Sequence, residues 1–184
     1  FECLARGLSC NTSLESLDLS RTTMIDASVI ALVDGLRTNK TLKCLDLSDN
    51  DSDDLGQSGR DAIERLIGYN VLRELFLVDT PASVGASTLA SGLFGNRSIE
   101  RINLENTFAG GEGPETFHAL CESLHRNTTL RHLNVGCNDV RLDSVCVTAL
   151  KLDTISLETL SLKSNPMTSC GIAALAQSLQ GRCT

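Results

Sequence analysis

The sequence predicts an α/β repeat protein in which strands and helices alternate with a regular period. Three observations lead to this prediction. An apolar-x-x-apolar-x-apolar-x-x-Asn/Thr pattern occurs six times. Its first positions, at residues 14, 42, 72, 99, 130 and 157, lie 27 to 31 residues apart. Between the matches, leucines spaced four apart indicate one face of a helix. A fixed period of this length is typical of stacked repeat architectures.

The six matches predict strands, because the second and third apolar residues alternate with a polar one. We expect the strands to start at residues 14, 42, 72, 99, 130 and 157. Each match closes on a short polar residue, which can bond the backbone where the chain leaves the strand. These closing residues are Thr22, Asn50, Thr80, Thr107, Asn138 and Asn165.

Helices are predicted between the strands. The leucine pairs that indicate them are Leu32 and Leu36, Leu89 and Leu93, Leu120 and Leu124, and Leu175 and Leu179. Two joints depart from the pattern. Residues 70–72 (Asn-Val-Leu) are one residue short, and residues 147–156 lack an asparagine before the strand. We expect these two joints to be less regular than the others.

Residues 39–42 (Asn-Lys-Thr-Leu) and 127–130 (Asn-Thr-Thr-Leu) each follow an apolar helix and lead into a strand. With the six matches, they make the chain resemble the leucine-rich repeat family, in particular its ribonuclease-inhibitor-like class. The resemblance implies a right-handed βα solenoid with a horseshoe arc. Its parallel sheet would form the concave face and its helices the convex face. It also implies a single domain of about six repeats over residues 1–184.

Both ends of the repeat array look incomplete in the sequence. Leu4, Leu8 and Asn11 match the end of a repeat whose strand is missing, and Leu175 and Leu179 match a helix with no strand after it. Terminal repeats normally carry polar caps. We therefore expect a segment of a longer solenoid, or ends that a partner or neighbouring domain covers.

Composition argues against nucleic-acid and membrane partners. The net charge is −7, with 23 acidic against 16 basic residues, and aromatic residues make up 3% of the chain. A grip on nucleic acid needs a basic face. No apolar run approaches the roughly 20 residues of a membrane span. The eight cysteines contain no Cys-x-x-Cys pair and fit a reduced, core-packing role, so we expect a cytoplasmic protein.

Motifs that suggest chemistry have simpler interpretations. Four Asn-x-Ser/Thr sequons, at Asn11, Asn39, Asn96 and Asn127, all lie three residues before a strand, so the repeat itself generates them. Residues 49–54 imitate a calcium loop but place Asp54 where glycine is needed and Arg60 where a glutamate is needed.

Metal and catalytic sites also lack support. His118, Cys121 and His125 share a helix flank, yet the two histidines would lie about 10.5 Å apart along the axis. Cys121 belongs to the apolar stripe of that helix. Residues 110–113 lack the spacing of a dinucleotide loop. We predict no cofactor, no metal, no catalytic residue and no enzymatic activity.

Function is expected on the strand face, because repeat solenoids bind partners on their concave surface. Strand alternation sets which side chains point outward. The first three repeats contribute acids and the last three are neutral to basic, which predicts a basic protein partner for the acidic half. Phe76 is a candidate anchor, although it can equally pack on its neighbours. The candidate binding residues are Asp18, Asp46, Glu74, Phe76, Val78, Arg101, Asn103, His132 and Asn134.

The favoured function is a non-catalytic scaffold that binds a protein partner on the concave strand face. The alternative is a regulator of a small GTPase, of the kind that activates the GTPase Ran, since the ribonuclease-inhibitor-like class includes such proteins. That activity would require an acidic tail or specific loop residues, and no residue of this chain matches them. The partner and the oligomeric state stay open.

Overall fold

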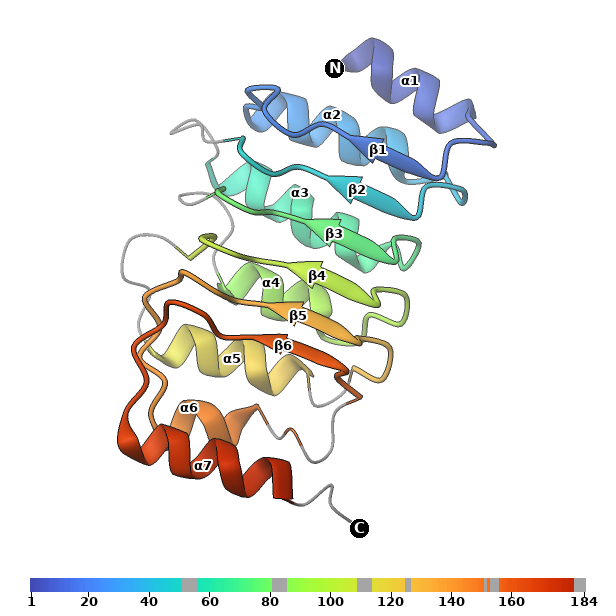
Figure 1. Ribbon diagram of the computed structural model, residues 1–184. Helices are drawn as coiled ribbons and strands as arrows, with labels where there is room; N and C mark the ends of the chain where they lie inside the picture. The colour runs from blue at the N-terminus through green and yellow to red at the C-terminus, as the bar shows by residue number, and fades with distance from the viewer. Residues whose placement is uncertain are drawn as a thin grey trace.

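The computed structural model describes residues 1–50, 56–80, 86–108, 114–124, 127–150, 152 and 156–180. Strands and helices alternate along the chain (Figure 1). The strands are β1 (Ser16–Asp18), β2 (Cys44–Asp46), β3 (Glu74–Phe76), β4 (Arg101–Asn103), β5 (His132–Asn134) and β6 (Thr159–Ser161). The helices are α1 (Glu2–Cys10), α2 (Asp26–Leu36), α3 (Gln57–Gly68), α4 (Ala86–Leu93), α5 (Pro114–Leu124), α6 (Ser144–Ala149) and α7 (Ser169–Gln180).

The six strands form one parallel sheet in the order β1 to β6, which confirms the predicted α/β solenoid. Their register is constant, because the middle residue of each strand pairs with the middle residue of the next. These middle residues are Leu17, Leu45, Leu75, Ile102, Leu133 and Leu160. Each strand begins two residues after the first apolar residue of its match, because that apolar residue and its successor lead into the pairing.

Strands and helices occupy opposite layers (Figure 1). Paired strands are about 4.8 Å apart, whereas packed helices need about 8–10 Å. A stack that has one strand and one helix per coil therefore bends toward its strands. We call the sheet surface that points away from the helices the inner face.

The apolar core lies between the two layers. Leu45, Leu75 and Ile102 point inward from the strands and are fully buried, as are Leu32 and Leu120 from the helices. The two end coils are less covered, since β1 and β6 lack the buried middle residue of the inner strands. The core thus runs as one continuous column through the coils.

Asparagines at the strand exits tie neighbouring coils together. The Asn138 amide donates to the backbone carbonyl oxygens of Leu104 at 2.8 Å and Val135 at 3.0 Å. Its side-chain oxygen accepts from the amides of Thr107 at 2.7 Å and Phe108 at 2.8 Å. Asn50 and Asn165 make equivalent bonds. We use the name exit ladder for the six residues that close the matches: Thr22, Asn50, Thr80, Thr107, Asn138 and Asn165.

A second set of asparagines acts where each strand begins. The Asn39 side chain accepts from the amides of Thr41 and Leu42 at 2.9 Å and donates to the Leu8 carbonyl at 2.8 Å. Asn96 and Asn127 repeat this arrangement, and both are buried. We call Asn11, Asn39, Asn96 and Asn127 the entry ladder. The two ladders satisfy backbone groups that the turns between coils would otherwise leave buried without partners.

The two expected irregular joints differ from the regular ones. Asn70 takes a left-handed conformation with φ 56° and accepts from the Arg97 amide at 2.6 Å, instead of bonding its own strand entry. The bond from Asn96 to the Ile67 carbonyl stays regular, because it is equivalent to the bond from Asn39 to the Leu8 carbonyl. At the second joint, α6 (Ser144–Ala149) is six residues long and overlaps the start of the 147–156 segment, in which residues 151 and 153–155 lie outside the described part.

Removing an exit-ladder side chain should destabilise the fold strongly. Asn138→Ala leaves several buried backbone groups of two coils without partners, so we expect a loss of about 3 kcal/mol in the free energy of unfolding. Urea denaturation measures it. Asn103→Ala is the control, because the Asn103 side-chain oxygen accepts one bond, from the Glu105 amide at 3.2 Å. Equal losses in the two variants would contradict the role of the exit ladder.

Candidate functional site

The inner face consists of parallel rows of side chains, one from each strand. The strand register sets the rows, as the sequence predicted. The first row is Ser16, Cys44, Glu74, Arg101, His132 and Thr159, and the second is Asp18, Asp46, Phe76, Asn103, Asn134 and Ser161. A third row, just past the strands, is Ser20, Ser48, Val78, Glu105, Gly136 and Lys163.

A hollow of about 270 Å³ lies over β3 to β6 on this face. Phe76 borders it on the β3 side, and Thr159 and Ser161 border it on the β6 side. The His132 ring nitrogen Nδ1 on β5 lies 2.9 Å from the Thr159 hydroxyl on the adjacent strand β6. The hollow combines one aromatic wall with amide, hydroxyl, imidazole and guanidinium groups, which suits a polypeptide segment with mixed side chains.

Five of the nine candidate residues line the hollow: Phe76, Arg101, Asn103, His132 and Asn134. The other four, Asp18, Asp46, Glu74 and Val78, belong to the same three rows but are outside its lining. Sequence reasoning omitted Thr159 and Ser161, although their row positions in the last strand were visible in the repeat pattern.

The acidic half of the face is laid out by β1, β2 and β3. Asp18 and Asp46 are register neighbours, and each accepts a 2.8 Å bond from the amide two residues later. Hydrogen bonds from the Ser20 side chain and backbone lower the pKa of Asp18, which favours its charged form. Glu74 differs, because it lies 3.8 Å from the Arg101 guanidinium across the next strand. Negative charge is therefore concentrated on the first two coils.

A polar cluster occupies the third row beside the hollow. Glu105 accepts from Lys163 Nζ at 2.7 Å, from Asn134 Nδ2 at 2.9 Å and from the Cys137 thiol at 3.6 Å. The hydrogen bond from Lys163 lowers the pKa of Glu105 most, and the bond from Asn134 lowers it further. The bond between Lys163 and Glu105 also raises the pKa of Lys163. This cluster links β4, β5 and β6 at the point where their chains leave the sheet.

Lys163 reaches Glu105 by passing over Gly136, which separates them in the third row. A Cβ atom on Gly136 would lie 2.6 Å from Lys163 Cγ and 3.2 Å from Asn134 Oδ1. Any larger residue at this position would displace the lysine. Glycine is needed here for the close approach of a neighbouring side chain.

The motifs that imitate other sites have structural roles where the structure describes them. The side chains of Asn39, Asn96 and Asn127 are buried and their amide nitrogens donate to backbone carbonyls. The Asn11 side chain accepts from the Ser13 and Leu14 amides, so all four sequons belong to the entry ladder. Asn50 belongs to the exit ladder, while residues 51–54 of the calcium-like run lie outside the described part.

On the helix flank that carries His118 and Cys121, the cysteine belongs to the apolar core. Cys121 is fully buried, and burial raises its pKa, with a further contribution from Cys146 nearby. His125 and residues 110–113 lie outside the described residues. In the part that is described, seven cysteines are free thiols, and no three His, Cys, Asp or Glu side chains gather as a metal would require.

Comparison with known proteins agrees with the geometry. The family model described as Leucine Rich repeat matches residues 10–33, 38–56 and 126–143. The chain is a leucine-rich repeat protein. Each matched segment contains an entry-ladder asparagine, a strand and an exit-ladder residue of the solenoid. Leucine-rich repeats are protein-interaction modules and are generally non-catalytic.

One curated relative and one solved structure are similar to the chain. The chain is 31% identical over 170 residues to the human NACHT, LRR and PYD domains-containing protein 5. The match covers 89% of this chain and 14% of that protein, so the leucine-rich repeats described here span a small part of the relative. The tropomodulin C-terminal domain of Caenorhabditis elegans shares the fold at a TM-score of 0.61 and 12% identity, covering 97% of this chain and 90% of that one. Across the described ranges, none of the helices is both long and apolar enough to cross a bilayer.

Replacing Gly136 should break the ion pair that crosses it. In Gly136→Ala the new methyl group displaces Lys163, so we expect the pKa of Glu105 to rise toward its ordinary value. Titration of the Glu105 carboxyl group by NMR measures this change. A folded-state pKa below the ordinary value stabilises the fold above that value, and this stabilisation is lost as the pH falls through the folded-state pKa.

Gly68→Ala is the control, because a Cβ atom on Gly68 meets nothing within 4 Å. It should leave the titration of Glu105 unchanged. An unchanged Glu105 pKa in Gly136→Ala would contradict the steric role of the glycine.

Proposed function

We propose that this leucine-rich repeat protein is a non-catalytic scaffold that binds a protein segment on its inner face. The observation that supports the proposal is the hollow over β3 to β6, which five candidate binding residues line together. The spacing of 27 to 31 residues and the helix in each coil further suggest the ribonuclease-inhibitor-like class.

Phe76 is the proposed anchor of the interaction. It stands at the border between the acidic strands and the hollow, with Asp46 and Asn103 as its register neighbours. It is half-buried rather than part of the core, which leaves part of the ring for a partner. Binding energy at interfaces is concentrated on a few residues, and large aromatic side chains are frequent among them.

Charge favours a basic segment on β1 and β2. Asp18 and Asp46 lie side by side, and the bonds that they accept come from their own turns. Among the described residues no ion pair engages Asp18 or Asp46, so a lysine or arginine of the partner would gain a Coulomb interaction here. The proposed segment therefore places an apolar side chain near Phe76 and basic side chains toward β1.

Truncating the anchor should weaken binding without unfolding the protein. Peptides selected from a phage-displayed library against the intact chain serve as the probe, and calorimetric titration measures their affinity. We expect Phe76→Ala to weaken binding about 30-fold, or about 2 kcal/mol, because a buried contact at the centre of the interface is lost. The melting temperature should change little.

Phe94→Ala is the matched control, since Phe94 is 58% exposed and lies just after α4 on the helix layer. Equal binding by the Phe76→Ala variant and the unmodified chain would contradict the proposal. Stimulated GTP hydrolysis on adding the chain to a small GTPase would instead support a regulatory function.

Neutralising the acidic pair should slow association. In Asp18→Asn/Asp46→Asn, the attraction for a basic segment is reduced, so we expect a lower association rate and a weaker dependence on salt. Surface plasmon resonance at two salt concentrations measures both. The control Asp34→Asn/Asp61→Asn removes the same charge from α2 and α3. Identical kinetics in both double variants would contradict charge steering by the inner face.

A further inference from the structure

The second row of the inner face changes its hydrogen-bonding character along the sheet. Four of its side chains accept a bond from the backbone amide two residues later, at 2.8 to 3.2 Å: Asp18, Asp46, Asn103 and Asn134. One oxygen of each side chain is thereby turned toward the exit of its own strand. The other end of the side chain, which differs between aspartate and asparagine, is left for a group that lies over the sheet.

This other end is an acceptor on β1 and β2 and a donor on β4 and β5. In Asp18 and Asp46 it is the second carboxylate oxygen, which only accepts. In Asn103 and Asn134 it is the NH₂ group, because the side-chain oxygen is already held by a backbone amide. Within the described residues, the Asn103 nitrogen bonds no protein group, and the Asn134 nitrogen donates one bond, to Glu105 at 2.9 Å. The row therefore reverses its polarity between β2 and β4.

Arg101 adds a cation to the donor end of the row. It lies on the same face of β4 as Asn103, and both line the hollow. The distance of 3.8 Å to the Glu74 carboxylate is longer than a hydrogen bond, and in the described part of the chain the guanidinium group donates no hydrogen bond. A guanidinium group presents five N–H donors in a planar fork that matches a carboxylate. Arg101 is therefore equipped to bind an acidic side chain in the hollow.

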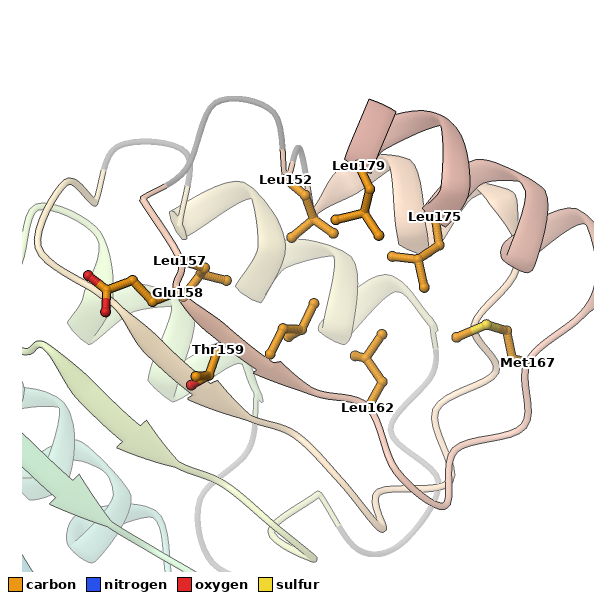
Figure 2. Close-up of a pocket in the computed structure, with 9 residues that line it drawn as sticks. Leu152, Leu157, Glu158, Thr159, Leu162, Met167, Leu175 and Leu179 are labelled. Carbon is orange, nitrogen blue, oxygen red and sulfur yellow. The ribbon is translucent and has the colours of Figure 1, made fainter. Parts of the chain in front are cut away.

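Hydroxyl groups extend the donor end to β6. Figure 2 shows that the Thr159 side chain points away from Leu175 and Leu179 of α7, so it belongs to the inner face. Ser161 follows on the same face of β6, and both residues line the hollow. Across the described ranges, the Ser161 hydroxyl bonds no protein group. The far side of the hollow thus offers a further polar group to a ligand.

An ion pair holds the acid beside the donor end. Glu105 accepts from Lys163 Nζ at 2.7 Å, and Gly136 permits this contact because the lysine stem passes where a Cβ atom would lie. Arg101 with Glu74, and Lys163 with Glu105, leave no net charge around the hollow. An incoming carboxylate consequently meets hydrogen-bond donors and no uncompensated negative charge.

The spacing of the strands matches that of alternate residues in an extended peptide. Adjacent strands lie about 4.8 Å apart, so the centre of the aspartate pair and the centre of the asparagine pair each lie about 7 Å from Phe76 on β3. Alternate side chains of an extended peptide point to the same side and are also about 7 Å apart. A segment that crosses the strands can place three alternate side chains on the three parts of the row at once.

We propose that the segment bound on the inner face carries a basic, an apolar and an acidic side chain at alternate positions, in that order from β1 toward β6. The basic side chain lies over Asp18 and Asp46, and the apolar one packs on Phe76. The acidic side chain enters the hollow and binds Arg101 and Asn103. This inference rests on the proposed function and names its partner, a protein segment in which opposite charges flank an apolar residue.

The first test selects peptides from a phage-displayed library against the intact chain. Enriched peptides that lose affinity for the Phe76→Ala variant are those bound on the inner face. We expect them to share a basic, an apolar and an acidic residue at alternate positions, in one chain direction or its reverse. Inner-face peptides without this pattern would overturn the inference and leave the proposed function standing. If no enriched peptide depends on Phe76, both are overturned.

The second test asks whether Arg101 contacts the acidic residue. Calorimetric titration compares an enriched peptide with its analogue that has glutamine in place of the acid. We expect Arg101→Gln to weaken binding of the acidic peptide about tenfold and to change binding of the analogue little, because only the carboxylate loses a charged partner. The control Arg65→Gln also removes an arginine that pairs with an acid, Asp34 at 3.4 Å, but on the helix layer. Equal losses for both peptides in Arg101→Gln would overturn the inference.

The third test reverses the polarity of the row at one position. Asn103→Asp keeps an acceptor for the Glu105 amide, as Asp46 has for the Ser48 amide, but replaces the donor with an acceptor. We expect the acidic peptide to bind about tenfold more weakly, and its analogue with lysine in place of the acid to bind more tightly than it binds the unmodified chain. Thermal unfolding verifies that the variant is folded. An unchanged preference for the acid over lysine would overturn the inference.

Discussion

The turns between coils impose the main physical constraint on this molecule. Each turn places backbone amides and carbonyls between the sheet and the helix layer, where water does not reach them, and an unpaired buried group costs about 1–3 kcal/mol. Asparagine meets this need because its side chain has an acceptor and two donors on one planar group. Asn39 and Asn138 each join two coils in this way. The leucines supply the driving force for stacking, and the asparagines determine which backbone groups meet.

This division of tasks leaves the outward residues of the inner face free to vary. The inward residue of each strand is leucine or isoleucine and the ladder positions are asparagine or threonine, so both sets are fixed by the fold. The outward residues range from Asp18 to Phe76 and His132. Neither the core nor the ladders restrict them, except where a neighbour lies close, as Lys163 does over Gly136. The solenoid can therefore present an acidic half and a mixed hollow on one rigid sheet.

The leucine period alone predicts the strands, their parallel register and the rows of the inner face, since each of these depends on a repeated spacing. The conformational preferences of the individual residues do not predict the backbone conformation where the chain leaves each strand. Arg21, Cys137 and Ser164 take left-handed conformations with φ between 54° and 58°, although glycine and asparagine favour that region. The amide of Cys137 bonds the Lys163 carbonyl at 2.9 Å, so contact between coils imposes the conformation. The sequence pattern does not predict the bond from Lys163 to Glu105 either, for a related reason. It skips a strand, and a pattern based on adjacent neighbours does not reveal such a contact.

The geometry of the sheet limits how a partner could bind over the hollow. Over β3, β4 and β5 the hollow offers no strand edge, because both sides of each of these strands are already paired. A partner there must bind through side chains, by the shape and charge of the three rows. In the proposed interaction, recognition on the inner face is therefore set by residues that vary from coil to coil.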